Sequence, residues 1–235
     1  MIVLLLILTF LIAYSLGNLS GSAVLSSYVF RRAAARHSRA ESPLSEFYRD
    51  FGIIGCAMLV IYDLLRTLLA ITAGGWLLSF VDQAVIGKLF AAFCLLLGQC
   101  YPLLFLFKGG KGLLCAGASV FLLDWRVGLC CCLAFVIAVI FTRYTAIGSV
   151  LAAVVAPVFT WIFDLGYTTG PAWLPGVLAL LCALVVLSKQ VGGMMRIFSG
   201  EEARVFPLTS YAPPDPEELF PEVEEEEEDD DGTPY

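Results

Sequence analysis

A glycine-rich turn with two lysines is the stretch of this 235-residue sequence best suited to chemistry. An apolar run ends at Phe107 and continues into KGGKG (Lys108 to Gly112), after which another apolar run begins. Glycines let the backbone turn tightly, so that several N–H groups can point to one place. The positive N-terminal end of the following helix adds to the field there. Together with two ammonium groups, this arrangement favours binding of a phosphate. The alternative interpretation is a flexible loop whose lysines only set the orientation of the chain in a membrane.

Two further places carry charges beside or inside apolar runs. Arg143 follows one such run, where it can bind a phosphate bidentately or simply reach the membrane interface. Asp63 and Arg66 lie within another run, and their spacing of three places them on one helical face, where they can neutralise each other. Charges at such depth indicate a functional site. A pair that only locks helix packing is an equally good interpretation.

The eight cysteines all lie in apolar segments, and the single histidine is His37. No CxxC pair lies near a histidine, so the sequence predicts neither a metal site nor a disulfide framework. We interpret the cysteines as small apolar packing residues.

Composition indicates an all-α, polytopic membrane protein, because 59% of the residues are hydrophobic and only 15% are charged. Ordinary globular chains are about 45–50% apolar and about 25% charged. A helix needs roughly 20 apolar residues to cross a membrane. The seven candidate spans are 2–30, 52–73, 86–107, 112–124, 127–141, 144–164 and 172–189. The first is interrupted by GNLSGS, and the fourth and fifth are short enough to be either tilted helices or one bent pair.

Basic residues orient these spans with the N-terminus outside and the C-terminus inside. In that arrangement all 14 lysines and arginines except Lys88, Arg126 and the intramembrane Arg66 fall on the cytoplasmic side. We therefore predict a transmembrane domain over residues 1–204. Residues 205–235 are proline-rich and then strongly acidic, which predicts a disordered tail.

In its motifs and their spacing the chain resembles the bacterial PlsY-type acyl-phosphate:glycerol-3-phosphate acyltransferases, over roughly residues 10–204. Four patterns of that family carry the resemblance. GHxxPxxxxFKGGKG is matched by Gly98-Gln99, Pro102 and Phe107 to Gly112, and TRYxSxGS by Thr142-Arg143-Tyr144 and Gly148-Ser149. DxxKG is matched by Asp63, with Arg66 in place of lysine, and RLxxGxE by Arg196-Ile197 and Gly200.

Other family patterns are lost. GSGNIGATN should fall at residues 38–46, which read SRAESPLSE, with Arg39, Glu41 and Glu46 at its serine and asparagine positions. The histidine of GH is Gln99, and HRxNI becomes Gln190-Val191 followed by Gly193-Met194. Two glutamates would repel a dianionic substrate unless arginines such as Arg39 compensate.

The lead hypothesis is an acyltransferase with the usual or an altered acceptor. The second is a catalytically silent paralogue that binds phosphate or lipid, or acts as an interaction protein. A transporter would show two halves with matching broken helices, and none is visible.

The resemblance implies transfer of an acyl group from acyl-phosphate to the 1-hydroxyl of glycerol 3-phosphate, giving lysophosphatidic acid for phospholipid synthesis. It implies no metal or other cofactor, a place in the bacterial plasma membrane with cytoplasmic active loops, and no nucleic-acid partner. The partners it implies are acyl-phosphate, glycerol 3-phosphate or a related phosphate acceptor, and membrane lipid. The residues that it places in catalysis are Gln99, Arg143 and Ser149. Those that it places in substrate or phosphate binding are Lys108, Gly109, Gly110, Lys111, Gly112, Arg39, Asp63 and Arg196.

Overall fold

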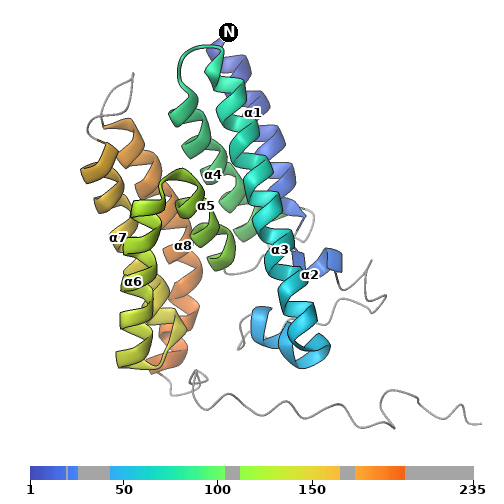
Figure 1. Cartoon of the computed structure of the whole chain (residues 1–235), viewed down its shortest axis with the longest axis vertical. Coiled ribbons are helices and arrows are strands. Elements are labelled where there is room, and N and C mark those ends of the chain that lie inside the picture. Colours follow the sequence, from blue (N-terminus) through green and yellow to red (C-terminus); the bar gives the residue numbers. More distant parts are fainter. Residues whose placement is uncertain (20, 26–42, 104–111, 165–172, 199–235) are drawn as a thin grey trace, which may run out of the picture.

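The computed structural model describes residues 1–19, 21–25, 43–103, 112–164 and 173–198, and within these ranges it contains only helices and the turns between them (Figure 1). The helices are α1 (Ile2–Asn18), α2 (Gly21–Val24), α3 (Pro43–Ser79), α4 (Ala84–Cys100), α5 (Leu113–Leu123), α6 (Trp125–Thr142), α7 (Thr145–Asp164) and α8 (Leu174–Phe198).

Seven of these helices are apolar and at least ten residues long, which confirms the predicted all-α membrane fold. The predicted number of seven spans stays a prediction. Four are long enough to cross a bilayer by themselves: α6, α7, α8 and the part of α3 that follows a bend at Gly52. The shorter apolar helices are α1, α4 and α5. α2 has only four residues.

Several helix ends differ from the predicted spans, for identifiable reasons. The first span was expected to reach residue 30, but α1 ends at Asn18, within the polar GNLSGS break. α4 ends at Cys100 instead of continuing to residue 107, because Pro102 cannot donate a backbone hydrogen bond and disfavours a helical residue before it. The fourth and fifth spans are two helices with only Asp124 between them.

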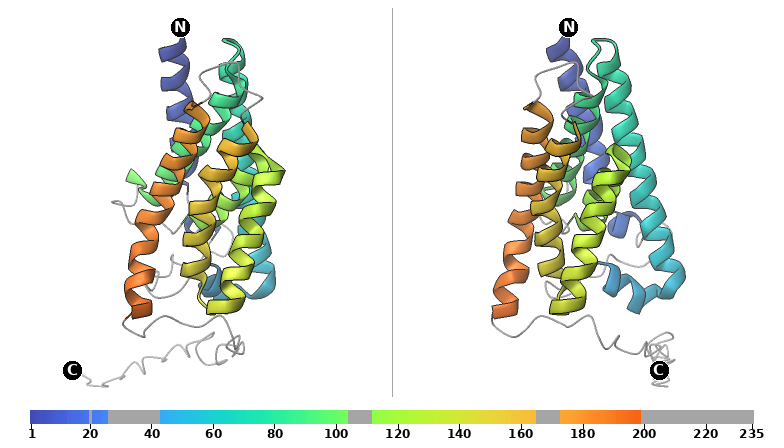
Figure 2. Two further views of the ribbon diagram at one scale, coloured as in Figure 1. Left: turned by 90° about the vertical axis from the view of Figure 1, so that its left-hand side faces the viewer. Right: turned by 60° about the vertical axis from the view of Figure 1, so that its left-hand side comes forward.

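Successive long helices alternate in direction, so Met1 lies at one end of the bundle and the end of α8 at the other (Figures 1 and 2). α1, α3 and α4 pack together as one group, and α6, α7 and α8 as another, with α4 against α8 joining them. The side of the membrane on which each end lies stays a prediction.

The core is built on both sides of α4. Leu95 packs with Ala13 of α1 and Ala70 of α3. Its neighbour Leu96 packs in a second cluster with residues of α5, α7 and α8, among them Cys115 and Val186. Because α4 is covered on two sides, it positions its own polar residues relative to both helix groups.

Two glycines allow α1 and α4 to approach closely. A Cβ atom added to Gly17 would lie 2.8 Å from the Cα of Gly98, and one added to Gly98 would lie 2.5 Å from the carbonyl oxygen of Tyr14. Real Cβ atoms do not approach backbone so closely, so these positions admit only glycine without movement of a helix. Small residues that let backbones approach are typical of helix contacts in membranes.

We expect Gly98→Val to push α1 away from α4 and to lower the free energy of unfolding by about 1–3 kcal/mol or more, as overpacking does. Gly192→Ala in α8 is the matched control, because its added Cβ would meet nothing within 4 Å. It should be neutral or slightly stabilising, since alanine favours helix over glycine. Unfolding of both variants in detergent measures this, and equal stabilities would contradict the close contact.

Candidate active site

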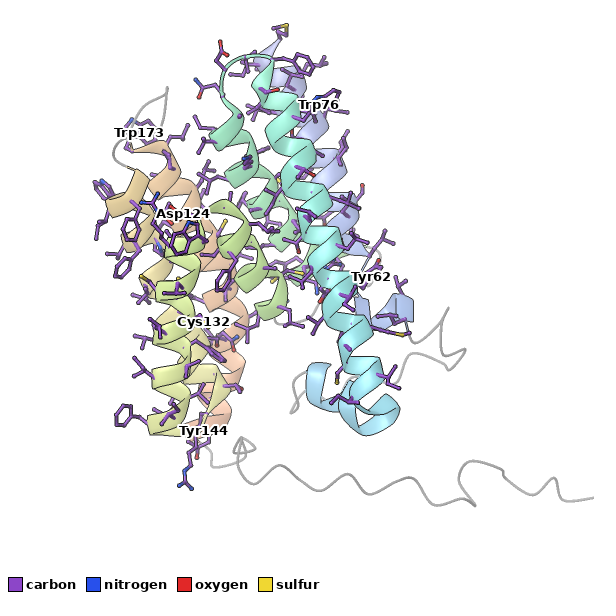
Figure 3. All side chains as sticks on the ribbon, in the orientation of Figure 1. Tyr62, Trp76, Asp124, Cys132, Tyr144 and Trp173 are labelled. Carbon is purple, nitrogen blue, oxygen red and sulfur yellow. The ribbon has the colours of Figure 1, made fainter. Side chains whose placement is uncertain are left out.

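A cavity of about 890 Å³ is lined by residues of α3, α4, α5, α6, α7 and α8, and by Gly21 of the short α2. Its walls are mainly apolar, and along α7 they run from Thr145 to Thr160. At 1.5 Å per residue this stretch is about 22 Å long, longer than one leaflet of a bilayer with ~30 Å of hydrocarbon. Cys132 of α6 and the N-cap residue of this helix, Asp124, belong to the cavity wall. Figure 3 shows Asp124 at the upper end of α6, Cys132 near its middle and Tyr144 at its turn to α7.

Polar side chains line the end of the cavity where α4 finishes and α5 and α7 begin. Gln99 comes from α4, Ser149 from α7 and Gln190 from α8. The Ser149 hydroxyl donates to the carbonyl oxygen of Ala146 at 2.8 Å, so its lone pairs remain able to accept a hydrogen bond. This end can therefore bind a ligand that carries both donors and acceptors.

Gln190 is the least satisfied polar group in this wall. Its side chain is 1% exposed, and its Oε1 atom has no hydrogen-bond partner among the described residues. A buried acceptor without a donor is costly, and native structures leave few of them. A donor supplied by a ligand at this end of the cavity would satisfy it.

Asp63 and Arg66 form a buried ion pair in α3, with 3.0 Å between Arg66 Nη2 and Asp63 Oδ1. Nη1 of the same guanidinium donates to carbonyl oxygens at the end of α1, those of Leu16 (3.4 Å), Gly17 (3.5 Å) and Leu19. The last carbonyls of a helix lack intrahelical donors, so Arg66 satisfies them. The pair thus neutralises itself, as its spacing predicts, and also joins α3 to α1.

Gly112 connects the predicted phosphate loop to the cavity. It has φ = 66° and precedes the first residue of α5 without any side-chain cap on that helix. A residue with a side chain would be strained at this φ, and its Cβ would lie 2.8 Å from Cys100 Sγ. The α5 N-terminus, whose first N–H groups lack helical partners, therefore opens beside Gly112 in the cavity wall.

Four of the predicted site residues, from four different helices or helix ends, line this one cavity: Asp63, Gln99, Gly112 and Ser149. Arg143 is not among the lining residues. It is exposed at the turn between α6 and α7, with φ = 62°. Lys108, Gly109, Gly110, Lys111 and Arg39 lie outside the described residues, and so does the side chain of Arg196, whose backbone belongs to α8.

Comparison with known proteins decides the family. A family model described as glycerol-3-phosphate acyltransferase matches residues 7–200. The chain belongs to this family. It is 28% identical over 200 residues to the glycerol-3-phosphate acyltransferase of Pseudoalteromonas translucida, covering 84% of this chain and 92% of the relative. It is 29% identical over 197 residues to that of Photobacterium profundum, covering 83% of this chain and 90% of the relative.

The fold of this glycerol-3-phosphate acyltransferase family member is also that of solved structures. PlsY (YgiH), an integral membrane glycerol 3-phosphate acyltransferase, aligns in its glycerol 3-phosphate form with a TM-score of 0.68 and 21% identity, covering 85% of this chain and 94% of PlsY. Its lysophosphatidic acid form aligns with a TM-score of 0.67 over the same shares. Family membership confirms the resemblance seen in the sequence and makes the chain a membrane acyltransferase.

Two polar residues of this acyltransferase were not among the predicted site residues. Gln190 was noted only as a replaced family position, and Arg66 as the partner of Asp63 and as the residue at a family lysine position. Both are polar residues inside long apolar runs, and that signal alone marks intramembrane candidates. It does not distinguish a residue in the cavity wall, such as Gln190, from one that lies behind it.

Proposed function

We propose that this protein transfers an acyl group from an acyl-phosphate to glycerol 3-phosphate, giving lysophosphatidic acid and inorganic phosphate. The observation that carries the proposal is the cavity, which in a chain of this family joins a long, mainly apolar wall to the polar side chains of Gln99, Ser149 and Gln190. Lys88, Asp124 and Arg126 also line it, near the starts of α4 and α6. A membrane acyltransferase with a long-chain donor needs both parts. The two PlsY structures are described with glycerol 3-phosphate and with lysophosphatidic acid, which are the acceptor and the product of the proposed reaction.

In the proposed step a hydroxyl oxygen of the acceptor attacks the carbonyl carbon of the acyl-phosphate. The bond from that carbon to the phosphate oxygen breaks, inorganic phosphate leaves, and the hydroxyl proton passes to a phosphate oxygen. The protein contributes mainly by holding the two substrates in place and stabilising charge. Gln99, Ser149 and Gln190 would hold the acceptor at the polar end. The run from Lys108 to Gly112 would hold a phosphate.

Purified protein in detergent, given a long-chain acyl-phosphate and glycerol 3-phosphate, should release phosphate and form lysophosphatidic acid in equal amounts. Mass spectrometry of the lipid and a phosphate assay measure this. Phosphate release without a lysolipid would contradict transfer to glycerol 3-phosphate. Binding of either substrate with no turnover would favour the silent paralogue, although family membership supports the acyltransferase.

The apolar wall predicts a preference for acyl-chain length that a single substitution should change. Ala156 lines the cavity along α7, so Ala156→Phe should block the wall part of the way along and shift the preferred donor to shorter chains. Val158→Phe is the control, because Val158 is 52% exposed on α7 and does not line the cavity. Relative turnover across donors of different chain length is the measurement. An unchanged preference in Ala156→Phe would show that the acyl chain binds elsewhere.

We place the protein in the bacterial cell membrane, with the N-terminus outside and the loop at Lys108–Lys111 in the cytoplasm. The basic residues support this orientation. Met1 and the end of α8 lie at opposite ends of the bundle (Figure 2), which fits chain ends on opposite sides of the membrane. A reporter fused after Tyr235 should read cytoplasmic, and one fused before Met1 should read external. Both reporters on one side of the membrane would exclude an odd number of spans.

A further inference from the structure

Arg66 lies behind the polar end of the cavity and contacts groups that line it. It is 3% exposed and is not itself a lining residue. Its Nη2 atom donates to Asp63 Oδ1 at 3.0 Å, to Gln99 Oε1 at 2.7 Å and lies 2.8 Å from Cys115 Sγ. Asp63, Gln99 and Cys115 come from α3, α4 and α5, and all three line the cavity. One guanidinium therefore holds one wall-lining group from each of three helices.

This contact decides which way the Gln99 amide faces. A guanidinium only donates hydrogen bonds, so the Gln99 atom that faces Arg66 has to be the carbonyl oxygen. The amide nitrogen, with two donor hydrogens, is then left for the cavity. Without Arg66 the amide could rotate by 180° and place its carbonyl oxygen toward the cavity. This oxygen would repel a phosphate or carbonyl oxygen of a substrate, because both atoms are hydrogen-bond acceptors.

We propose that Arg66 is a positioning residue, which orients the Gln99 amide so that its NH₂ group donates a hydrogen bond to a substrate oxygen at the polar end of the cavity. The proposal rests on the proposed function, because it assigns a role within that same site. It gives Gln99 a single chemical role, that of a neutral hydrogen-bond donor aimed at the reacting groups.

The two terminal nitrogens of Arg66 donate hydrogen bonds to different places. Nη1 donates to carbonyl oxygens at the end of α1, while Nη2 donates to Asp63 and Gln99. A lysine has a single nitrogen on a flexible stem and cannot occupy both places in this fixed geometry. Arg66→Lys therefore keeps the charge that neutralises Asp63 but should release Gln99.

The sharpest variant is Gln99→Glu, which keeps an oxygen for Arg66 and replaces the amide donor with a second oxygen. We expect it to fold with lower stability than the wild type, because it places a second carboxylate beside Arg66 and Asp63. We also expect it to lose at least about tenfold in kcat, the effect of one hydrogen bond to a charged group. Turnover at the wild-type rate in Gln99→Glu would overturn the proposal. This variant tests the role of the NH₂ group even if Arg66→Lys fails to fold.

A double-mutant cycle then tests the link between the two residues. Arg66→Lys and Gln99→Leu should each lower kcat about tenfold or more, and the double variant should be no slower than Gln99→Leu alone. Thr9→Val is the control, because Thr9 is 1% exposed in α1, bonds only within its helix and does not line the cavity. It should lower the unfolding temperature and leave kcat and KM unchanged. A merely structural Arg66 would behave as Thr9 does, and fully additive losses in the double variant would also overturn the proposal.

The shift that glycerol 3-phosphate causes in the unfolding temperature separates this inference from the proposed reaction. Wild type that shows the shift but no turnover would refute the reaction alone. In that case the shift in unfolding temperature would replace kcat as the measured quantity of the double-mutant cycle. Gln99→Glu and Arg66→Lys should both reduce this shift. Wild type that shows turnover together with unchanged kinetics in Arg66→Lys would refute the positioning role alone. Wild type with neither shift nor turnover would overturn both.

Discussion

Replacing Asp63 with leucine should destabilise the protein by about 3–5 kcal/mol, because it leaves the Arg66 charge buried without its partner. Both side chains are at least nine-tenths buried, at 7% and 3% exposure. Arg66 also joins α3 to α1, so the loss should loosen the contact between these helices. Unfolding in detergent, followed by circular dichroism or by a thermal assay, measures the change.

The matched comparison is Arg126→Leu, which breaks the pair of Arg126 with Asp124 at 3.6 Å. Arg126 is 45% exposed and Asp124 32%, and exposed pairs contribute only about 0–1 kcal/mol. Its loss should therefore change stability much less. Equal losses of stability in the two variants would contradict the stabilising role of the buried Asp63–Arg66 pair.

Removing the second lysine of the glycine-rich loop should weaken phosphate binding most strongly among changes outside the core. Lys111→Ala deletes one charge-assisted contact, worth about 1.5–3 kcal/mol or roughly 10- to 100-fold in affinity. Gly110→Val should act similarly, because a β-branched side chain would restrict the backbone of the tight turn that the sequence predicts at this glycine. Binding of glycerol 3-phosphate, acyl-phosphate or inorganic phosphate to each variant is the measurement.

Lys189→Ala is the control for the loss of a lysine that the charge distribution also predicts to be cytoplasmic. The Lys189 Nζ atom lies 4.0 Å from the centre of the Tyr101 ring and does not line the cavity. We expect Lys189→Ala to retain phosphate affinity. A loop that serves only to orient the chain in the membrane would tolerate all three substitutions alike, and equal affinities would support that alternative.

The fold class and the family could be read from the sequence alone. The number of candidate spans follows from the average hydropathy of about 20 consecutive residues, which does not depend on tertiary contacts. KGGKG and TRY are contiguous patterns, so they too are visible in one dimension. Helix ends were less predictable where a short polar break or a proline acted, as after Asn18 and at Pro102.

Only the tertiary structure decided which polar residues meet. Arg66 bonds to the carbonyl of Leu16, 50 residues away, and to Gln99, 33 residues away. In a bilayer the lipid-facing and protein-facing sides of a helix are both apolar, so no amphipathic stripe tells which face turns inward. The rotation of each helix follows from contacts such as that of Gly17 with Gly98. That packing brings Gln99, Ser149 and Gln190 to one end of one cavity and leaves Arg66 behind its wall.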